Sequence, residues 1–127
     1  MAEPAVLILI AILFAVMGIS SIVAPLLTTA QFGINELGRD GRNEVRAIYG
    51  GFGMAMAGVL VVATLMPELR AGVSLTVAVA LGGMAAGRVL SAALDGSIGR
   101  KPAFYLGLEF SGFALLFWVS GIAMTIL

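Results

Sequence analysis

Two residues of opposite charge lie inside long apolar segments of this sequence. Arg88 lies near the end of one segment, and Glu109 lies five residues after Phe104, the first apolar residue of the next. At about 1.5 Å per helical residue, both charges lie roughly 8–10 Å from the neighbouring segment ends. Since consecutive membrane helices run antiparallel, these equal depths predict an Arg88–Glu109 ion pair. Such a pair can clamp two helices, bind a polar group or exchange protons.

Other polar residues are expected in the same layer. Arg46 and Tyr49 begin another apolar segment. Asp95 follows Arg88 by seven residues, about two helical turns on the same face, and is a candidate second partner for the arginine. Ser91 lies between them. The candidate polar layer, in a ligand-binding or a structural role, consists of Arg46, Tyr49, Arg88, Ser91, Asp95 and Glu109.

Each of these residues also has a purely structural interpretation. Arg88 can snorkel to the lipid headgroups as a topology anchor, with Glu109 present only to neutralise it. Arg46 suits an interfacial anchor, and Tyr49 suits the aromatic belt at the membrane surface. The sequence leaves both interpretations open.

The sequence contains no cysteine and no histidine. The first absence excludes disulfides, thiolate nucleophiles, iron–sulfur clusters and thiolate zinc sites. The second excludes histidine-ligated haem, histidine zinc sites and imidazole acid–base catalysis. We therefore predict no metal site, no cofactor and no catalytic residues, and any proton chemistry must use Asp, Glu, Tyr or Lys.

The elements that must position these residues are membrane helices. Of 127 residues, 61% are hydrophobic and 11% are charged, with seven charges of each sign. Soluble domains carry about 25% charged residues, so a soluble fold is excluded, and the balanced charge argues against a nucleic-acid binder. Four apolar runs reach the length of about 20 residues that a bilayer core requires. We predict an all-α membrane protein with a single domain over 1–127, a four-transmembrane-helix bundle at about 5–27, 46–66, 71–94 and 104–127.

The connections between these runs predict the orientation. A polar loop is expected at 28–43, a tight turn at 67–70 and a third connection at 95–102. The first and third connections carry most of the basic loop residues, which are Arg39, Arg42, Arg100 and Lys101. Because cytoplasmic loops are enriched in Lys and Arg, these two connections are predicted to be cytoplasmic and both termini non-cytoplasmic.

Small residues form a second pattern in the apolar segments. Glycines recur along them, with one GxxxG in the third segment, and glycine lets helix backbones approach closely in lipid. Packing within the bundle explains such positions, and a ligand groove or a subunit contact is the alternative. The glycines predicted to pack helices are Gly50, Gly53, Gly83, Gly87 and Gly112.

The stretch from Asn43 to Gly51 reads N-E-V-R-A-I-Y-G-G, and a later stretch reads G-R-V-L-S from Gly87, followed by Asp95-Gly96. Together with Glu109, these motifs resemble a family of small bacterial four-helix membrane proteins classed as domain-of-unknown-function family 4345. The resemblance covers Asn43 to the C-terminus. It implies a four-helix fold in the bacterial cytoplasmic membrane, singles out the same polar residues and implies no established activity.

Three classes of function are compatible with these features. The first is a non-catalytic binding or accessory subunit of a larger membrane complex, which can also hold a lipid-like molecule. Its partners would be membrane lipids, other subunits or a second copy. The second is a small proton-coupled transporter in which Glu109 cycles its proton. The third is an intramembrane enzyme that acts on a lipid-like substrate with Glu109 or Tyr49 as acid–base groups. We favour the first, because no catalytic motif supports the third and a nearby Arg88 opposes proton cycling at Glu109.

Overall fold

The computed structural model describes residues 2–126, and all the regular elements in this range are helices. The elements are α1 Ala2–Val23, α2 Pro25–Ala30, α3 Arg39–Val45, the π-helix η1 Arg46–Gly51, α4 Phe52–Leu65, α5 Pro67–Asp95, α6 Arg100–Ser120 and α7 Ile122–Ile126. Within the described residues, four helices are long and apolar enough to cross a membrane: Ala2–Val23, Arg39–Leu65, Pro67–Asp95 and Arg100–Ser120. The predicted all-α class with four membrane-spanning helices is confirmed, and the chain is a multi-pass membrane protein.

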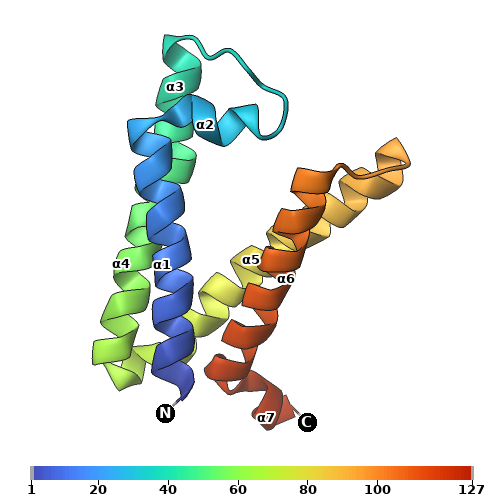
Figure 1. The fold of residues 1–127 in the computed structure, drawn as a ribbon. Coiled ribbons are helices and arrows are strands. Elements are labelled where there is room, and N and C mark those ends of the chain that lie inside the picture. The colour runs from blue at the N-terminus through green and yellow to red at the C-terminus, as the bar shows by residue number, and fades with distance from the viewer. Residues whose placement is uncertain (1, 127) are drawn as a thin grey trace.

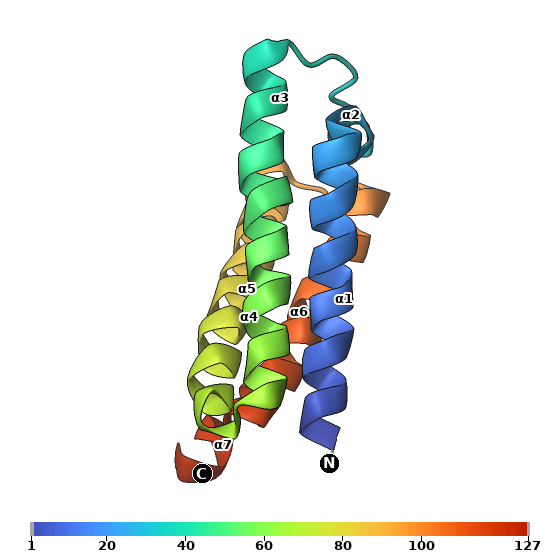
Figure 2. The ribbon, with the colours of Figure 1, turned by 90° about the vertical axis from the view of Figure 1, so that its left-hand side faces the viewer.

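The helices form two hairpins that diverge from a shared base. Helices α1 and α4 run side by side, and α5 and α6 form the second hairpin (Figure 1). Both chain ends lie at the base in two perpendicular views (Figures 1 and 2), whereas the long connection between α1 and α4 lies at the opposite end. The two hairpins meet through a buried apolar cluster of Leu7, Ile10, Ala11, Phe14, Ala57, Leu60, Ala63, Val77, Ala78, Leu81 and Leu116. Most other large apolar side chains are exposed, as a lipid-facing surface requires.

A proline ends the first membrane helix earlier than the sequence predicted. Helix α1 ends at Val23, and Ala24 leaves the helical region with φ −138° and ψ 72°. Pro25 lacks an N–H and disfavours a helical conformation in the residue before it. The chain therefore turns into α2, and the predicted continuation of the first helix to residue 27 is wrong.

Arg46 compensates for this break. Its Nε donates a hydrogen bond of 3.0 Å to the carbonyl oxygen of Ile22, in the last turn of α1. A cation at a helix C-terminus is also favoured by the helix dipole. Arg46 therefore closes the end of α1, and within residues 2–126 no hydrogen bond or ion pair joins it to Arg88 or Glu109.

The same arrangement recurs at the base of the bundle. Met66 breaks the helix before Pro67 with φ −123° and ψ 89°, and α5 starts at once. The predicted tight turn at 67–70 is thus the first turn of α5. Arg70 donates hydrogen bonds to the carbonyl oxygens of Ala63 and Thr64 at 3.3 and 3.0 Å. A second arginine thus pairs with the free carbonyl oxygens at the end of a helix that stops before a proline.

The remaining helix boundaries also differ from the prediction. The second span begins at Arg39 rather than 46, because α3 and η1 continue directly into α4. The predicted polar loop at 28–43 consequently shortens, with α2 taking its first residues and α3 its last. Helix α6 begins at Arg100 and ends at Ser120, where Gly121 adopts φ 76° and separates it from α7.

Close packing explains three of the five glycines predicted to pack helices. A Cβ added at Gly50 would lie 2.5 Å from Ile22 Cγ1, and one at Gly53 would lie 3.0 Å from the Phe14 carbonyl oxygen. One at Gly112 would lie 2.8 Å from Leu81 Cδ1. Gly50 and Gly53 thus allow the second membrane span to approach α1 closely, and Gly112 allows α6 to approach α5, where a larger residue would push the Leu81 side chain aside.

The other two predicted glycines do not pack against any helix of the described chain. A Cβ at Gly83 or Gly87 would have no atom within 4 Å, so neither glycine of the GxxxG motif is needed for a close helix contact. Gly18 was not predicted, yet its Cβ would lie 2.8 Å from the Gly50 carbonyl oxygen and 2.9 Å from Met54 N. Backbone atoms cannot move aside as a flexible side chain can.

We expect Gly18→Ala to lower the free energy of unfolding by about 1–3 kcal/mol, because the added methyl group overpacks the α1–α4 contact. Gly58→Ala is the matched control, since nothing lies within 4 Å of a Cβ at that position of α4. The control should be neutral or stabilising, as alanine favours a helix over glycine by about 1 kcal/mol. Unfolding in mixed detergent micelles, followed by circular dichroism, measures both. Equal effects of the two changes would contradict the close contact.

Candidate binding site

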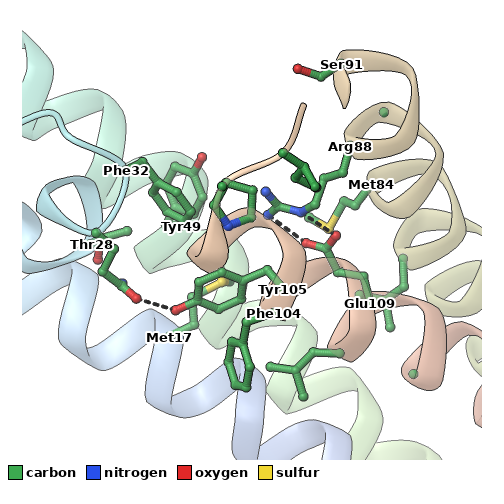
Figure 3. A pocket seen from close by; sticks show the side chains of 18 of the residues that line it. Met17, Thr28, Phe32, Tyr49, Met84, Arg88, Ser91, Phe104, Tyr105 and Glu109 are labelled. Atoms are coloured by element: carbon green, nitrogen blue, oxygen red, sulfur yellow. Dashed lines mark hydrogen bonds and ion pairs between the residues drawn. The ribbon is translucent and has the colours of Figure 1, made fainter. Parts of the chain in front are cut away.

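An ion pair between α5 and α6 lies at the centre of the site. Arg88 Nε donates to Glu109 Oε1 at 2.7 Å, and Arg88 Nη2 donates to Glu109 Oε2 at 2.9 Å (Figure 3). The Arg88 side chain is 27% exposed and that of Glu109 is 11% exposed. Two parallel charge-assisted hydrogen bonds give the pair a fixed planar geometry. The pair predicted from equal helix depths is present.

Two aromatic rings lie against the guanidinium of Arg88. Its Cζ is 5.9 Å from the ring centroid of Phe32 and 5.6 Å from that of Tyr105. The two ring centroids are 5.6 Å apart. Cation–π contacts of this length stabilise a charge that has left water. The pair is therefore covered on one side by aromatic surface.

A hydrogen bond joins the two hairpins beside these rings. The Tyr105 hydroxyl donates to Gln31 Oε1 at 2.6 Å, between α6 and the turn after α2. Gln31 and Phe32 reach α6 because the chain turns at Pro25 and α2 leaves the direction of α1 (Figure 1). The residues after α2 thus cross from the first hairpin to the second.

Sequence reasoning missed Gln31, Phe32 and Tyr105. Tyr105 lies four residues before Glu109, so the two share a helix face. That spacing could have predicted that Tyr105 lies near the ion pair. Gln31 and Phe32 lie in the segment predicted as a polar loop. Their contacts depend on the tertiary path of α2, for which the sequence carries no local signal.

A groove of about 1070 Å³ lies between the two hairpins, with the ion pair in its wall. Toward the base its lining is apolar and includes Ile10, Leu13 and Leu81. Toward the loops it is more polar. Along α1 the lining extends from Ile10 to Ser20, which corresponds to about 15 Å of helix. That length is about half of a bilayer core of about 30 Å.

The structure separates the other predicted polar residues. Tyr49 lies on η1, is 40% exposed and lines the groove. Ser91 and Asp95 line it nearer the loops, and Ser91 stands apart from the ion pair (Figure 3). Within residues 2–126, Asp95 makes no ion pair with Arg88, so its predicted role as a second partner is wrong.

The arrangement supports binding better than proton chemistry. Both oxygens of Glu109 accept hydrogen bonds from Arg88, whose charge keeps the carboxylate ionised and opposes its uptake of a proton. Tyr49, by contrast, makes no hydrogen bond through its hydroxyl to any described residue and faces the groove. A π-helix such as η1 commonly occurs at functional sites. The groove thus offers an apolar surface with a few fixed polar groups, the usual composition of a ligand site.

Comparison with known protein families gives one finding. The family model described as "Domain of unknown function (DUF4345)" matches residues 3–120. The comparisons with curated proteins and with solved structures gave no match. The family match covers all four membrane spans.

We expect Arg88→Met to lower the free energy of unfolding by up to about 3 kcal/mol, because Glu109 then loses its partner in apolar surroundings. The double change Arg88→Met with Glu109→Met should recover more than half of that loss, since no buried charge remains. Unfolding of the four proteins in mixed micelles gives the double-mutant cycle. A double variant as unstable as the sum of the single variants would show that the pair contributes no coupling.

Proposed function

Because this chain belongs to the DUF4345 family, whose description assigns no activity, we propose a function on the basis of the groove. The protein is a non-catalytic membrane protein that binds a lipid-like molecule between its two hairpins. The observation that carries the proposal is the groove of about 1070 Å³, apolar toward the base and walled by Arg88 and Glu109 at mid-depth. Its size matches the upper range of small-molecule sites, about 300–1,000 Å³. An amphiphile suits such a lining, with its polar part at the ion pair.

The depth of the groove also favours a lipid-like occupant. Its lining belongs to all four membrane spans, with Tyr49 from the second, together with the segment after α2. A ligand there is surrounded by lipid at the level of one leaflet. Molecules that already reside in the bilayer reach this site without crossing water.

The two alternative functions require more of Glu109 than binding does. A proton-coupled transporter needs this carboxylate to exchange protons with its substrate, and an enzyme needs it as an acid or base. In the structure both carboxylate oxygens are bonded to Arg88. Binding uses the pair as it stands.

We place the protein in the bacterial cytoplasmic membrane, with the groove in the cytoplasmic leaflet. Support comes from the basic residues at the groove end of the bundle, which include Arg39, Arg42, Arg100 and Lys101, whereas Arg70 lies at the base. Cytoplasmic connections carry such an excess of Lys and Arg. A holding role of this kind also suits an accessory subunit that presents its ligand to a second membrane protein.

Two glycines of α5 provide a matched test. Gly87 lines the groove and Gly83 does not, and a Cβ at either position meets no atom within 4 Å. We expect Gly87→Leu to fill the groove and to reduce the retained ligand at least about tenfold, which corresponds to about 1.4 kcal/mol. Gly83→Leu should retain the wild-type amount.

The measurement is native mass spectrometry of the full chain after gentle extraction from its membrane, which weighs any small molecule that stays bound. Ligand retained by wild type and Gly83→Leu but lost from Gly87→Leu supports the proposal. Wild-type protein that carries no amphiphile would overturn it, as would equal retention by all three proteins. The spectra also report whether Gly83→Leu changes the number of chains in the assembly.

A further inference from the structure

We infer that the molecule in this groove is a neutral lipid with a flat ring that carries carbonyl acceptors, the chemistry of a prenylated quinone. The inference rests on the proposed function and specifies its ligand. Three independent features of the lining carry it: its charge, its unpaired donors and its aromatic surface. The ring lies at the level of Arg88, and the tail extends along the apolar wall.

The charge of the lining favours a neutral head. The charged residues of the groove lining are Arg88, Asp95 and Glu109, one positive and two negative, and Arg88 is already neutralised by Glu109. An anionic head, such as a carboxylate or a phosphate, that binds the free N–H groups of Arg88 would share one guanidinium with the Glu109 carboxylate, and the two negative charges would repel each other. A cationic head at the same depth would face the guanidinium. Either cost is large in a medium of low dielectric constant.

The hydrogen-bonding groups of the lining favour a ligand that accepts. A guanidinium has five N–H groups, and Arg88 uses two of them on Glu109. The other three have no partner within residues 2–126, and neither has the Tyr49 hydroxyl. These groups belong to different hairpins and face the same pocket (Figure 3). A carbonyl-bearing head would satisfy donors that lipid tails leave unpaired.

The aromatic surface favours a flat head over a branched one. Phe32, Tyr49, Phe104 and Tyr105 all line the groove near the ion pair. Phe104 and Tyr105 lie edge to face, with centroids 5.4 Å apart, and Phe32 lies against Tyr105. Flat rings pack against such surfaces by offset stacking or edge-on contact. Ester-linked glycerol head groups have carbonyl acceptors but no flat ring that could pack against these aromatic side chains.

The apolar wall accommodates the tail. Leu13, Met17, Met84 and Leu108 line the groove around the level of the ion pair and toward the base. Methionine side chains adapt to irregular shapes, which suits a branched prenyl chain as well as a straight one. The head is thus positioned by polar and aromatic contacts, and the tail by adaptable apolar ones.

The test compares three probes with the same decyl tail on the full chain in nanodiscs: a decyl-substituted para-benzoquinone, decanoate and decylamine. Each is titrated against a neutral fluorescent alkyl probe bound to the protein. We expect the quinone to displace the probe at a concentration at least about tenfold lower than either charged competitor. Tyr49→Phe should weaken quinone binding about fivefold, as loss of one hydrogen bond predicts.

Thr76→Val is the matched control, because it removes a hydroxyl from α5 that bonds only to Gly72 and does not line the groove. It should leave quinone binding unchanged. The infrared carbonyl band of the bound quinone gives a readout that a structural role of Tyr49 would not move. That band should lie below its position in lipid and shift back in part in Tyr49→Phe.

The outcomes separate this inference from the function on which it rests. Tighter binding of decanoate or decylamine than of the quinone would overturn the inference that the head group is a neutral quinone-like ring. The proposal that the groove binds a lipid-like molecule would still stand. An unshifted carbonyl band, or quinone affinity unaffected by Tyr49→Phe, would overturn the assigned hydrogen bonds. A bound probe that no competitor displaces and that Gly87→Leu does not release would overturn the proposed function itself.

Discussion

The bidentate contact of Arg88 with Glu109 is the constraint on which the groove depends. A lone charge at this depth in lipid is costly, so each residue needs the other, and α5 and α6 must approach closely enough to join them. Gly112 allows that approach, because a Cβ there would lie only 2.8 Å from Leu81 Cδ1, one layer toward the base. The rings of Phe32 and Tyr105 then cover the guanidinium. A polar wall thereby persists inside an apolar fold.

Two proline breaks determine how the first hairpin meets this wall. Each break leaves helix carbonyls without partners, and lipid offers no water to satisfy them. Arg46 and Arg70 supply the missing donors at the two ends of the bundle. The break at Pro25 has a further consequence, because it turns α2 away from the axis of α1. The turn that follows α2 is then close enough to α6 for a hydrogen bond.

Arguments from spacing succeed in this sequence where the relevant geometry is local. Four apolar runs predict four spans, and equal depths in antiparallel helices predict the pairing of Arg88 with Glu109. The same arguments fail for Arg46, since its partner is a carbonyl exposed by a proline break more than twenty residues earlier. They also fail for Gly83, because a small-residue motif does not show whether a neighbouring helix lies against it. Spacing arguments also cannot predict the contact of Phe32 with Arg88, because that contact follows from the path of α2.

The divergence of the hairpins follows from where their contacts lie. The apolar cluster joins them near the chain ends, and the covalent connection at Met66 lies at the same base. Within residues 2–126, the side-chain hydrogen bonds of Arg70 join the hairpins at the base, and Tyr105 and Gln31 form the one such bond at the far end. Phe32 adds an aromatic contact to Arg88 beside it. Packing therefore fixes the base, whereas the width of the groove mouth depends on side chains that also line the site.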